Sequence, residues 1–176
     1  MTANLKLAAL LVTLAATSLV RAEALPKPIA DLERFVGTWK GTGSVAMGKD
    51  KAKVEMTWTC KQTSAKFGVI CTFRVTGFPG MAMYEETDLF GYEPNTETYH
   101  WFSVTNAGET HDHVAKAAKA GGVDKLQFVY TGMQDGKPLK EVIDLSFAKD
   151  GKSIEGRAET FVANASTSVL ELKARK

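Results

Sequence analysis

Short runs of alternating apolar and polar residues follow one another along the chain from about residue 36 onwards. In residues 54–60 (VEMTWTC) and 69–75 (VICTFRV), every second side chain is apolar. Alternation at period two is typical of a strand with one buried face. Turn signals rich in Gly, Pro, Asn and Asp separate these runs, as in an antiparallel meander. We therefore expect ten strands, near residues 36–46, 52–61, 67–76, 84–92, 97–105, 109–116, 123–132, 138–148, 152–162 and 166–175.

One short helix is expected over Ile29–Phe35, just before the first strand. A meander of ten strands has two exposed edges unless its first and last strands pair, and closure removes both. The pattern therefore predicts an all-β fold, a closed up-and-down antiparallel barrel wide enough to hold a small ligand. In FVGTWKGTGSV (35–45), Trp39 falls on the inward face, where we expect it to plug one barrel end beneath the helix. Gly37 and Gly41 share that face and would leave room for the indole.

The beginning of the chain has a different character. Lys6 precedes an apolar run that ends at Val20, and Val20 and Ala22 are small residues suited to the −3 and −1 positions of a signal-peptidase site. The run is too short to span a bilayer comfortably. We therefore predict a signal peptide over 1–22, with an uncleaved tethering helix as the alternative. Residues 23–176 are expected to form one barrel domain, periplasmic or secreted, with no stable membrane insertion once the signal is removed.

The charge balance argues against a nucleic-acid partner. The chain has 22 Lys and Arg against 20 Asp and Glu. Removal of the signal peptide takes away Lys6 and Arg21, so the mature chain is formally neutral. A neutral chain lacks the basic surface on which non-specific binding of nucleic acid depends. No pattern in the sequence specifies an oligomeric state.

The two cysteines, Cys60 and Cys71, lie on neighbouring predicted strands. Both fall on the more apolar face, and a tight turn centred on Ala65 and Lys66 sets them directly opposite each other. An exported chain is oxidised in its compartment, so we predict a disulfide between them. Redox or metal chemistry is the alternative, although the spacing is not that of a C-x-x-C motif.

Three segments resemble a known group of proteins. GTWKGTG (37–43), after a short helix, resembles the opening of the calycins, which include lipocalins, fatty-acid-binding proteins and nitrobindins. Together with LFGYEPNTETYHW (89–101) and LELKARK (170–176), it resembles most the bacterial lipocalin-like domain of unknown function family 1579. This resemblance implies a closed antiparallel barrel and no particular activity. Nitrobindin-like barrels hold haem through a His in the C-terminal part, and here the last His is His113.

Taking the apolar side of each strand as the inner one gives a cavity with an apolar, aromatic lining and few polar groups. Such a cavity suits a small hydrophobic or amphipathic molecule. The leading hypothesis is therefore an exported lipocalin-like carrier or sensor of such a molecule, without a cofactor. The alternative is that these side chains simply fill the barrel. The residues expected to line the cavity are Trp58, Phe73, Phe128, Tyr130, Glu141, Ile143 and Leu145.

His111 and His113 are the candidate metal ligands of the sequence. They are two residues apart on a predicted strand, so both imidazoles lie on one face. Thr110 and Val114 assign the opposite face to the interior, so we expect the two imidazoles outside the barrel. A metal-handling protein that uses this pair, with the methionines Met81 and Met83 as a further possibility, is the second hypothesis.

An enzyme on a calycin barrel is the third hypothesis. Glu86 and Asp88 share a face of their predicted strand and are a candidate acid/base pair. No nucleophile motif or phosphate-binding glycine loop accompanies them.

Overall fold

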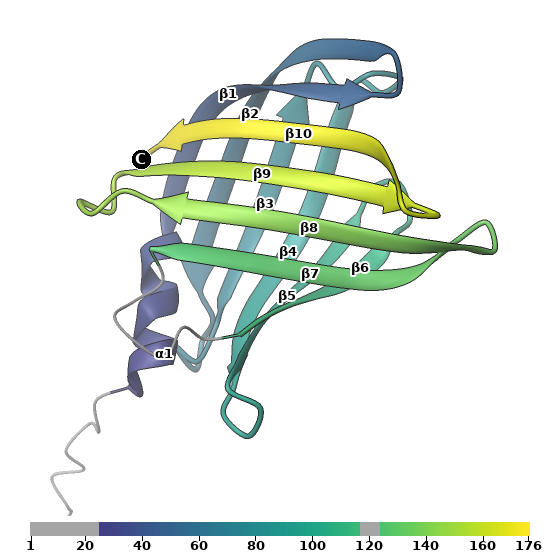
Figure 1. Cartoon of the computed structure of the whole chain (residues 1–176). Helices are drawn as coiled ribbons and strands as arrows, with labels where there is room; N and C mark the ends of the chain where they lie inside the picture. Colours follow the sequence, from purple (N-terminus) through teal and green to yellow (C-terminus); the bar gives the residue numbers. More distant parts are fainter. Residues whose placement is uncertain (1–24, 117–123) are drawn as a thin grey trace, which may run out of the picture.

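A computed structural model of the chain describes residues 25–116 and 124–176. Ten antiparallel strands close into a barrel in chain order, with the last strand pairing with the first (Figure 1). This is the predicted fold class. The helical elements are α1 (Lys27–Asp31) and a 3₁₀ turn, η1 (Leu32–Phe35). The strands are β1 (Gly37–Met47), β2 (Asp50–Gln62), β3 (Val69–Thr76), β4 (Met83–Glu93), β5 (Thr98–Thr105), β6 (Thr110–Lys116), β7 (Lys125–Gln134), β8 (Lys137–Phe147), β9 (Ser153–Val162) and β10 (Ala165–Arg175).

Each strand bound lies within two residues of its predicted position. The predicted signal peptide, residues 1–22, lies outside the described residues, as does the predicted start of the seventh strand at residue 123. Within the described ranges, no helix is both long and apolar enough to cross a bilayer.

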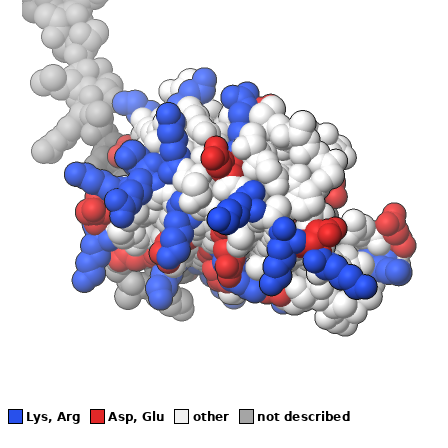
Figure 2. Space-filling view, turned by 90° about the horizontal axis from the view of Figure 1, so that it is seen from above, with Lys and Arg blue, Asp and Glu red and all other residues white. Residues whose placement is uncertain are grey.

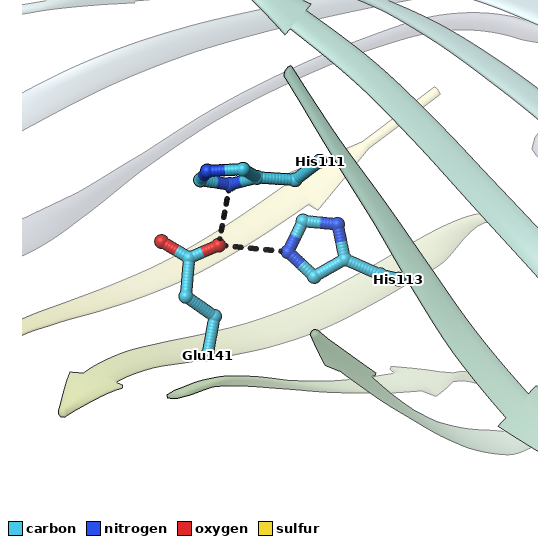
Figure 3. A group of neighbouring side chains, drawn as sticks. All are labelled: His111, His113 and Glu141. Atoms are coloured by element: carbon cyan, nitrogen blue, oxygen red, sulfur yellow. Dashed lines mark hydrogen bonds and ion pairs between the residues drawn. The ribbon is translucent and has the colours of Figure 1, made fainter. Parts of the chain in front are cut away.

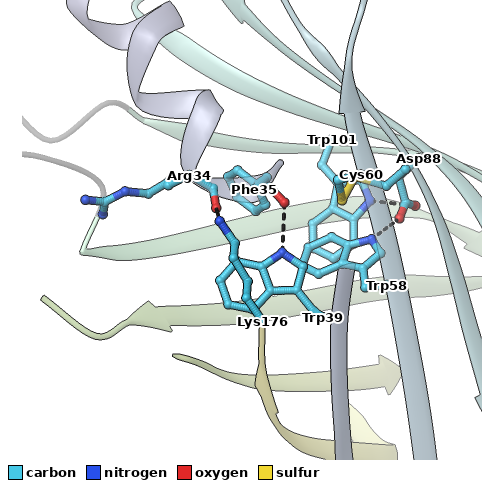
Figure 4. The surroundings of a disulfide bond; sticks show 9 residues. Arg34, Phe35, Trp39, Trp58, Cys60, Asp88, Trp101 and Lys176 are labelled. Atoms are coloured by element: carbon cyan, nitrogen blue, oxygen red, sulfur yellow. Dashed lines mark hydrogen bonds between the residues drawn. A yellow bond between two sulfur atoms is a disulfide. The ribbon is translucent and has the colours of Figure 1, made fainter. Parts of the chain in front are cut away.

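The helical segment closes one end of the barrel, as predicted. α1 begins at Lys27, two residues before the expected start, and continues into η1. The Phe35 side chain is fully buried, and its ring stacks on Phe90 at a centroid distance of 4.6 Å. Trp39 is also fully buried, and its indole nitrogen donates a hydrogen bond of 2.8 Å to the Phe35 carbonyl (Figure 4). Trp39 therefore plugs this end beneath the helical turn.

Gly41 and Gly43, near Trp39, allow β1 and β10 to approach each other closely where the barrel closes. A Cβ atom on Gly41 would lie 2.1 Å from the carbonyl oxygen of Lys173, and one on Gly43 would lie 1.9 Å from that of Glu171. Both contacted residues belong to β10, the strand that closes the barrel against β1. The expectation that Gly41 leaves room for the indole is therefore wrong, because the backbone of β10 takes that space.

The predicted disulfide is present. Cys60 on β2 and Cys71 on β3 are direct partners in the strand register and are bonded to each other. The turn between the strands contains Lys66 at a φ of 61°, in the left-handed region. The bond therefore joins neighbouring strands near the plugged end, close to Trp58 (Figure 4).

The charged side chains lie mostly on the outside. Figure 2 looks down on the side formed by β1, β2 and β10, where Lys and Arg are spread with Asp and Glu among them. One pair on this side joins Lys173 to Glu155 at 2.8 Å. The interior contains mostly apolar residues, together with a small number of polar side chains.

Candidate functional site

A cavity of about 620 Å³ occupies the barrel beyond the plug and extends to the turns opposite the helix. Residues of the β5–β6 and β7–β8 turns, among them Ala107 and Asp135, reach its edge. A volume of this size is typical of sites for small organic ligands, for which about 300–1,000 Å³ is usual. The barrel is therefore not completely filled by its own side chains.

Most of the predicted lining residues are on the cavity wall. Trp58, Phe73, Glu141, Ile143 and Leu145 all line it, together with apolar residues of β2, β9 and β10. Among these additional apolar residues are Met56, Ile154, Ala158, Leu170, Leu172 and Ala174. Whether any of them contacts a ligand stays a prediction.

Two predicted lining residues are not on the cavity wall. Phe128 is fully buried, with its ring centroid 5.6 Å from that of Trp101 and 6.2 Å from that of Phe90. Tyr130 stacks on His111 at a centroid distance of 4.1 Å. The alternation of β7 correctly identified the inward face. This alternation does not indicate how far a side chain lies from the cavity, and these two rings lie behind other side chains.

The predicted outward orientation of His111 and His113 is wrong. Both line the cavity, and their side chains are only 11% and 4% exposed, respectively. Val114 was the misleading residue, because a single apolar side chain made its face seem the inner one. Asp112 is exposed on that face and Ala115 is buried on the histidine face. A charged residue between two histidines was the available signal that the histidines face inward.

The imidazoles of His111 and His113 both contact the carboxylate of Glu141 on the inner side of the barrel (Figure 3). His113 Nε2 donates a hydrogen bond of 2.9 Å to Glu141 Oε2, and His111 Nδ1 lies 2.8 Å from the same oxygen. The histidines are on β6 and Glu141 is on β8, with β7 between them. Among the described residues, β6 and β7 share the one ladder pair Val114–Val129, and Glu141 contacts the histidines from the strand beyond β7.

Each member of this cluster affects the protonation of another: the two histidines favour the ionised form of Glu141, and Glu141 favours the protonated form of His111. Burial alone would raise the pKa of Glu141, but the hydrogen bonds and charges of His111 and His113 outweigh it and lower that pKa to about 2. The contact with Glu141 in turn raises the pKa of His111, against the effect of burial. Glu141 is therefore an ionised acceptor at neutral pH, and its second oxygen points away from both rings (Figure 3).

One polar atom of the cluster has no partner. Among the described residues, His113 Nδ1 is the buried side-chain nitrogen that accepts and donates no hydrogen bond. Buried polar atoms are nearly always paired, so an unpaired one needs an explanation. The neighbouring ring of Trp101, with its centroid 5.8 Å away, offers only packing.

A second polar group lies on β4, on the same side of the cavity. Asp88 is fully buried and accepts hydrogen bonds from the indole nitrogens of Trp58, at 3.0 Å, and Trp101, at 2.9 Å (Figure 4). Glu86 accepts a hydrogen bond from the Tyr84 hydroxyl and lines the cavity. The sequence placed Glu86 and Asp88 on one face, which is correct, but nothing in it indicated the two indole donors.

Burial raises the pKa of Glu86 well above its ordinary value, and the neighbouring Asp88 adds to the increase. Burial also raises the pKa of Asp88, although the hydrogen bonds from Trp101 and Trp58 act in the opposite direction. The pair therefore keeps a proton at a pH where carboxyl groups on the surface have lost theirs. Ser103, buried on β5, is the register partner of both Asp88 and His111, so the two polar groups form one band.

Comparison with known proteins gives a family and a fold. The family model described as "Protein of unknown function (DUF1579)" matches residues 27–115. No curated protein matches the sequence. Among solved structures, the crystal structure of Rv2717c from M. tuberculosis is similar, with a TM-score of 0.63 and 13% identity over 86% of this chain and 98% of that one. At this identity the likeness shows the fold alone, a calycin-like barrel.

Proposed function

Because the chain belongs to the DUF1579 family of proteins of unknown function, its function has to be inferred from the barrel itself, and we propose that it binds a small hydrophobic or amphipathic molecule in the cavity. In this proposal the protein is an exported carrier or sensor. The observation that carries the proposal is the cavity of about 620 Å³, apolar on one side and polar on the other. An apolar pocket with a few convergent polar groups is the usual form of a small-molecule site.

The two sides of the cavity indicate how such a molecule lies. Its apolar body packs against the wall formed by Met56, Phe73, Leu145 and Leu170. Its polar group meets the band of side chains on β4, β5, β6 and β8. In this orientation every buried polar group of the ligand has a hydrogen-bond partner. A buried polar group without a partner would cost about 1–3 kcal/mol of binding free energy.

The charges favour a neutral or positively charged polar group over a carboxylate. Among the described residues, Lys137 and Arg157 are the only Lys or Arg that border the cavity. Lys137 is at the β7–β8 turn, and Arg157 is paired with Glu159 at 2.6 Å. The ionised Glu141 lies at the centre of the polar band, where it would repel an anion.

Filling the cavity tests the proposal. Ala158 lies on the cavity wall, next to Ile143 and Leu170 in the strand register. Ala158→Phe should weaken binding of an apolar fluorescent probe by about tenfold or more, because the new ring occupies the space of the ligand. Lys53→Phe, on the exposed face of β2, is the matched control and should bind as the unaltered protein does.

Two results would count against binding in the cavity: equal probe affinity in both variants, or no probe binding by the unaltered protein. Circular dichroism and thermal melting of both variants ensure that a lost signal reflects the cavity and not an unfolded chain. Native mass spectrometry of the protein purified from its own source then identifies the retained organic mass.

Export is the second part of the proposal. The disulfide between Cys60 and Cys71 supports it, because such bonds persist in oxidising compartments. Fractionation of cells that express the full chain, with N-terminal sequencing, should find a periplasmic or secreted protein that begins at Glu23. A cytoplasmic protein that keeps residues 1–22 would contradict this part and leave the binding proposal intact.

A further inference from the structure

Three side chains of types that ligate metal ions meet on the polar side of the cavity. One ligand atom each from His111, His113 and Glu141 lies within 4.8 Å of the other two. Within residues 25–116 and 124–176, no other group of three His, Cys, Asp or Glu side chains comes together in this way. Two imidazoles and a carboxylate are a donor set suited to divalent transition metals.

The distances are close to those a metal ion requires. Tetrahedral Zn²⁺ with bonds of about 2.0–2.1 Å keeps its ligand atoms about 3.3 Å apart. The two measured N–O distances in the cluster are 2.8 and 2.9 Å. Widening both by about half an ångström needs only a small rotation within the Glu141 side chain, because the ligands are already on the same side of the barrel.

The three ligands are held on regular strands and leave a coordination position open. His111 and His113 project from β6 and Glu141 projects from β8, and all three line the cavity (Figure 3). Stacking on Tyr130 at 4.1 Å fixes the ring of His111. Three protein ligands leave the fourth position of a tetrahedral ion to water or to a bound molecule. That position faces the cavity.

The surroundings favour a cation. The carboxyl groups of Glu86 and Glu109 also line the cavity. Arg157 also borders the cavity, but its side chain is 43% exposed and its guanidinium is paired with Glu159. A positive ion at Glu141 would therefore lie near acidic residues, and Lys137, at the β7–β8 turn, is the basic residue of the described cavity wall that has no ion-pair partner.

The unpaired nitrogen of His113 limits the strength of such a site. When Nε2 of an imidazole ligates a metal, its proton resides on Nδ1 and is usually donated to a second group. His113 Nδ1 has no such partner. Loss of such a partner typically costs about 10–100-fold in metal affinity. The arrangement is that of an exchangeable site and not of a permanent structural metal.

We propose that His111, His113 and Glu141 form an exchangeable site for a divalent transition metal ion, Zn²⁺ foremost, with an open coordination position that faces the cavity. The proposal is independent of binding of an organic molecule. A ligand with a donor atom would complete the coordination, but the ion alone is sufficient to test the site.

The test is calorimetric titration of the chelator-treated, metal-free protein with Zn²⁺, and in parallel with Mg²⁺. We expect one equivalent of Zn²⁺ to bind and Mg²⁺ not to bind, because Mg²⁺ prefers oxygen ligands. Co²⁺ bound at the same site should give the visible absorption of a four-coordinate ion. Glu141→Gln and His111→Ala should each weaken Zn²⁺ binding by about tenfold or more.

The matched control is His100→Ala. His100 forms a similar pair with Asp112, at 3.1 Å, on the outer face of the barrel. Zn²⁺ binding that is unchanged in this variant and weakened in Glu141→Gln supports the cavity site. Binding lost in His100→Ala and retained in Glu141→Gln would mean an outer-surface site and would overturn the proposal, as would the absence of any stoichiometric binding.

A further variant separates this proposal from the proposed function. Ala158→Phe leaves all three metal ligands intact, so it should weaken probe binding about tenfold or more and retain Zn²⁺ binding. A protein that binds the apolar probe but no metal would refute the metal site alone. A protein that binds Zn²⁺ but no probe would refute the carrier alone. Thermal melting of Glu141→Gln confirms that the comparison is made between folded proteins.

Discussion

Replacement of Glu141 by Gln should lower the stability of the barrel in a manner that depends on pH. Gln keeps the size of the side chain but removes the charge that the two imidazoles face. The side chain of Glu141 is 20% exposed, so solvent screens its interactions only in part. The pKa of Glu141 falls from 4.5 to about 2 in the folded protein, which corresponds to a stabilisation of about 3 kcal/mol in total.

The sign of the effect sets the pH window. Because the folded-state pKa of Glu141 lies below the unfolded one, its stabilisation is present above about pH 4.5 and is lost as the pH falls towards 2. His111 takes part in the same interaction with the opposite sign. Its pKa is raised, so its stabilisation is present below its ordinary value of 6.5 and is lost as the pH rises through the raised value. The cost of Glu141→Gln is therefore largest between about pH 4.5 and 6.5.

Urea unfolding, followed by tryptophan fluorescence at several pH values, measures this cost. We expect a difference of up to about 3 kcal/mol near pH 5.5 that shrinks towards pH 2 and above neutrality. Glu55→Gln, at an exposed position of β2, is the control and should change stability by less than about 0.5 kcal/mol. A difference that is the same at every pH would refute the charge interaction, because a loss of packing does not titrate.

Three further predictions concern the barrel itself. Trp39→Ala should cost about 3–5 kcal/mol in urea unfolding, because it empties a fully buried position; an unchanged transition would mean that the plug is dispensable. Gly41→Ala should cost about 1–3 kcal/mol or more, because its Cβ would lie 2.1 Å from a β10 carbonyl oxygen. Gly91→Ala, where nothing lies within 4 Å, should be nearly neutral, and equal effects would disprove the close approach. Reduction of the Cys60–Cys71 bond, or Cys60→Ser with Cys71→Ser, should lower stability by about 2–3 kcal/mol, and a melting temperature insensitive to reductant would contradict this.

The features that depend on a local pattern of residues were predictable from the sequence. Period-two alternation and turn residues identified all ten strands within two residues, because side chains of a strand alternate whatever the strand packs against. The same alternation, with a short turn, placed Cys60 opposite Cys71. The position of Trp39 beside the short helix predicted the plug, since both features are close together in the chain.

Which side chains line the cavity depends on contacts between strands that are distant in the sequence. On β6 both faces are mixed, so the one apolar residue Val114 outweighed Asp112 and gave the wrong side for the histidines. Whether Phe128 and Tyr130 reach the cavity depends on which rings of other strands cover them. The residues of β7 alone do not show this. The contact of Glu141 with His111 joins residues two strands apart. The register and spacing of neighbouring strands, on which such a contact depends, are set only when the whole barrel closes.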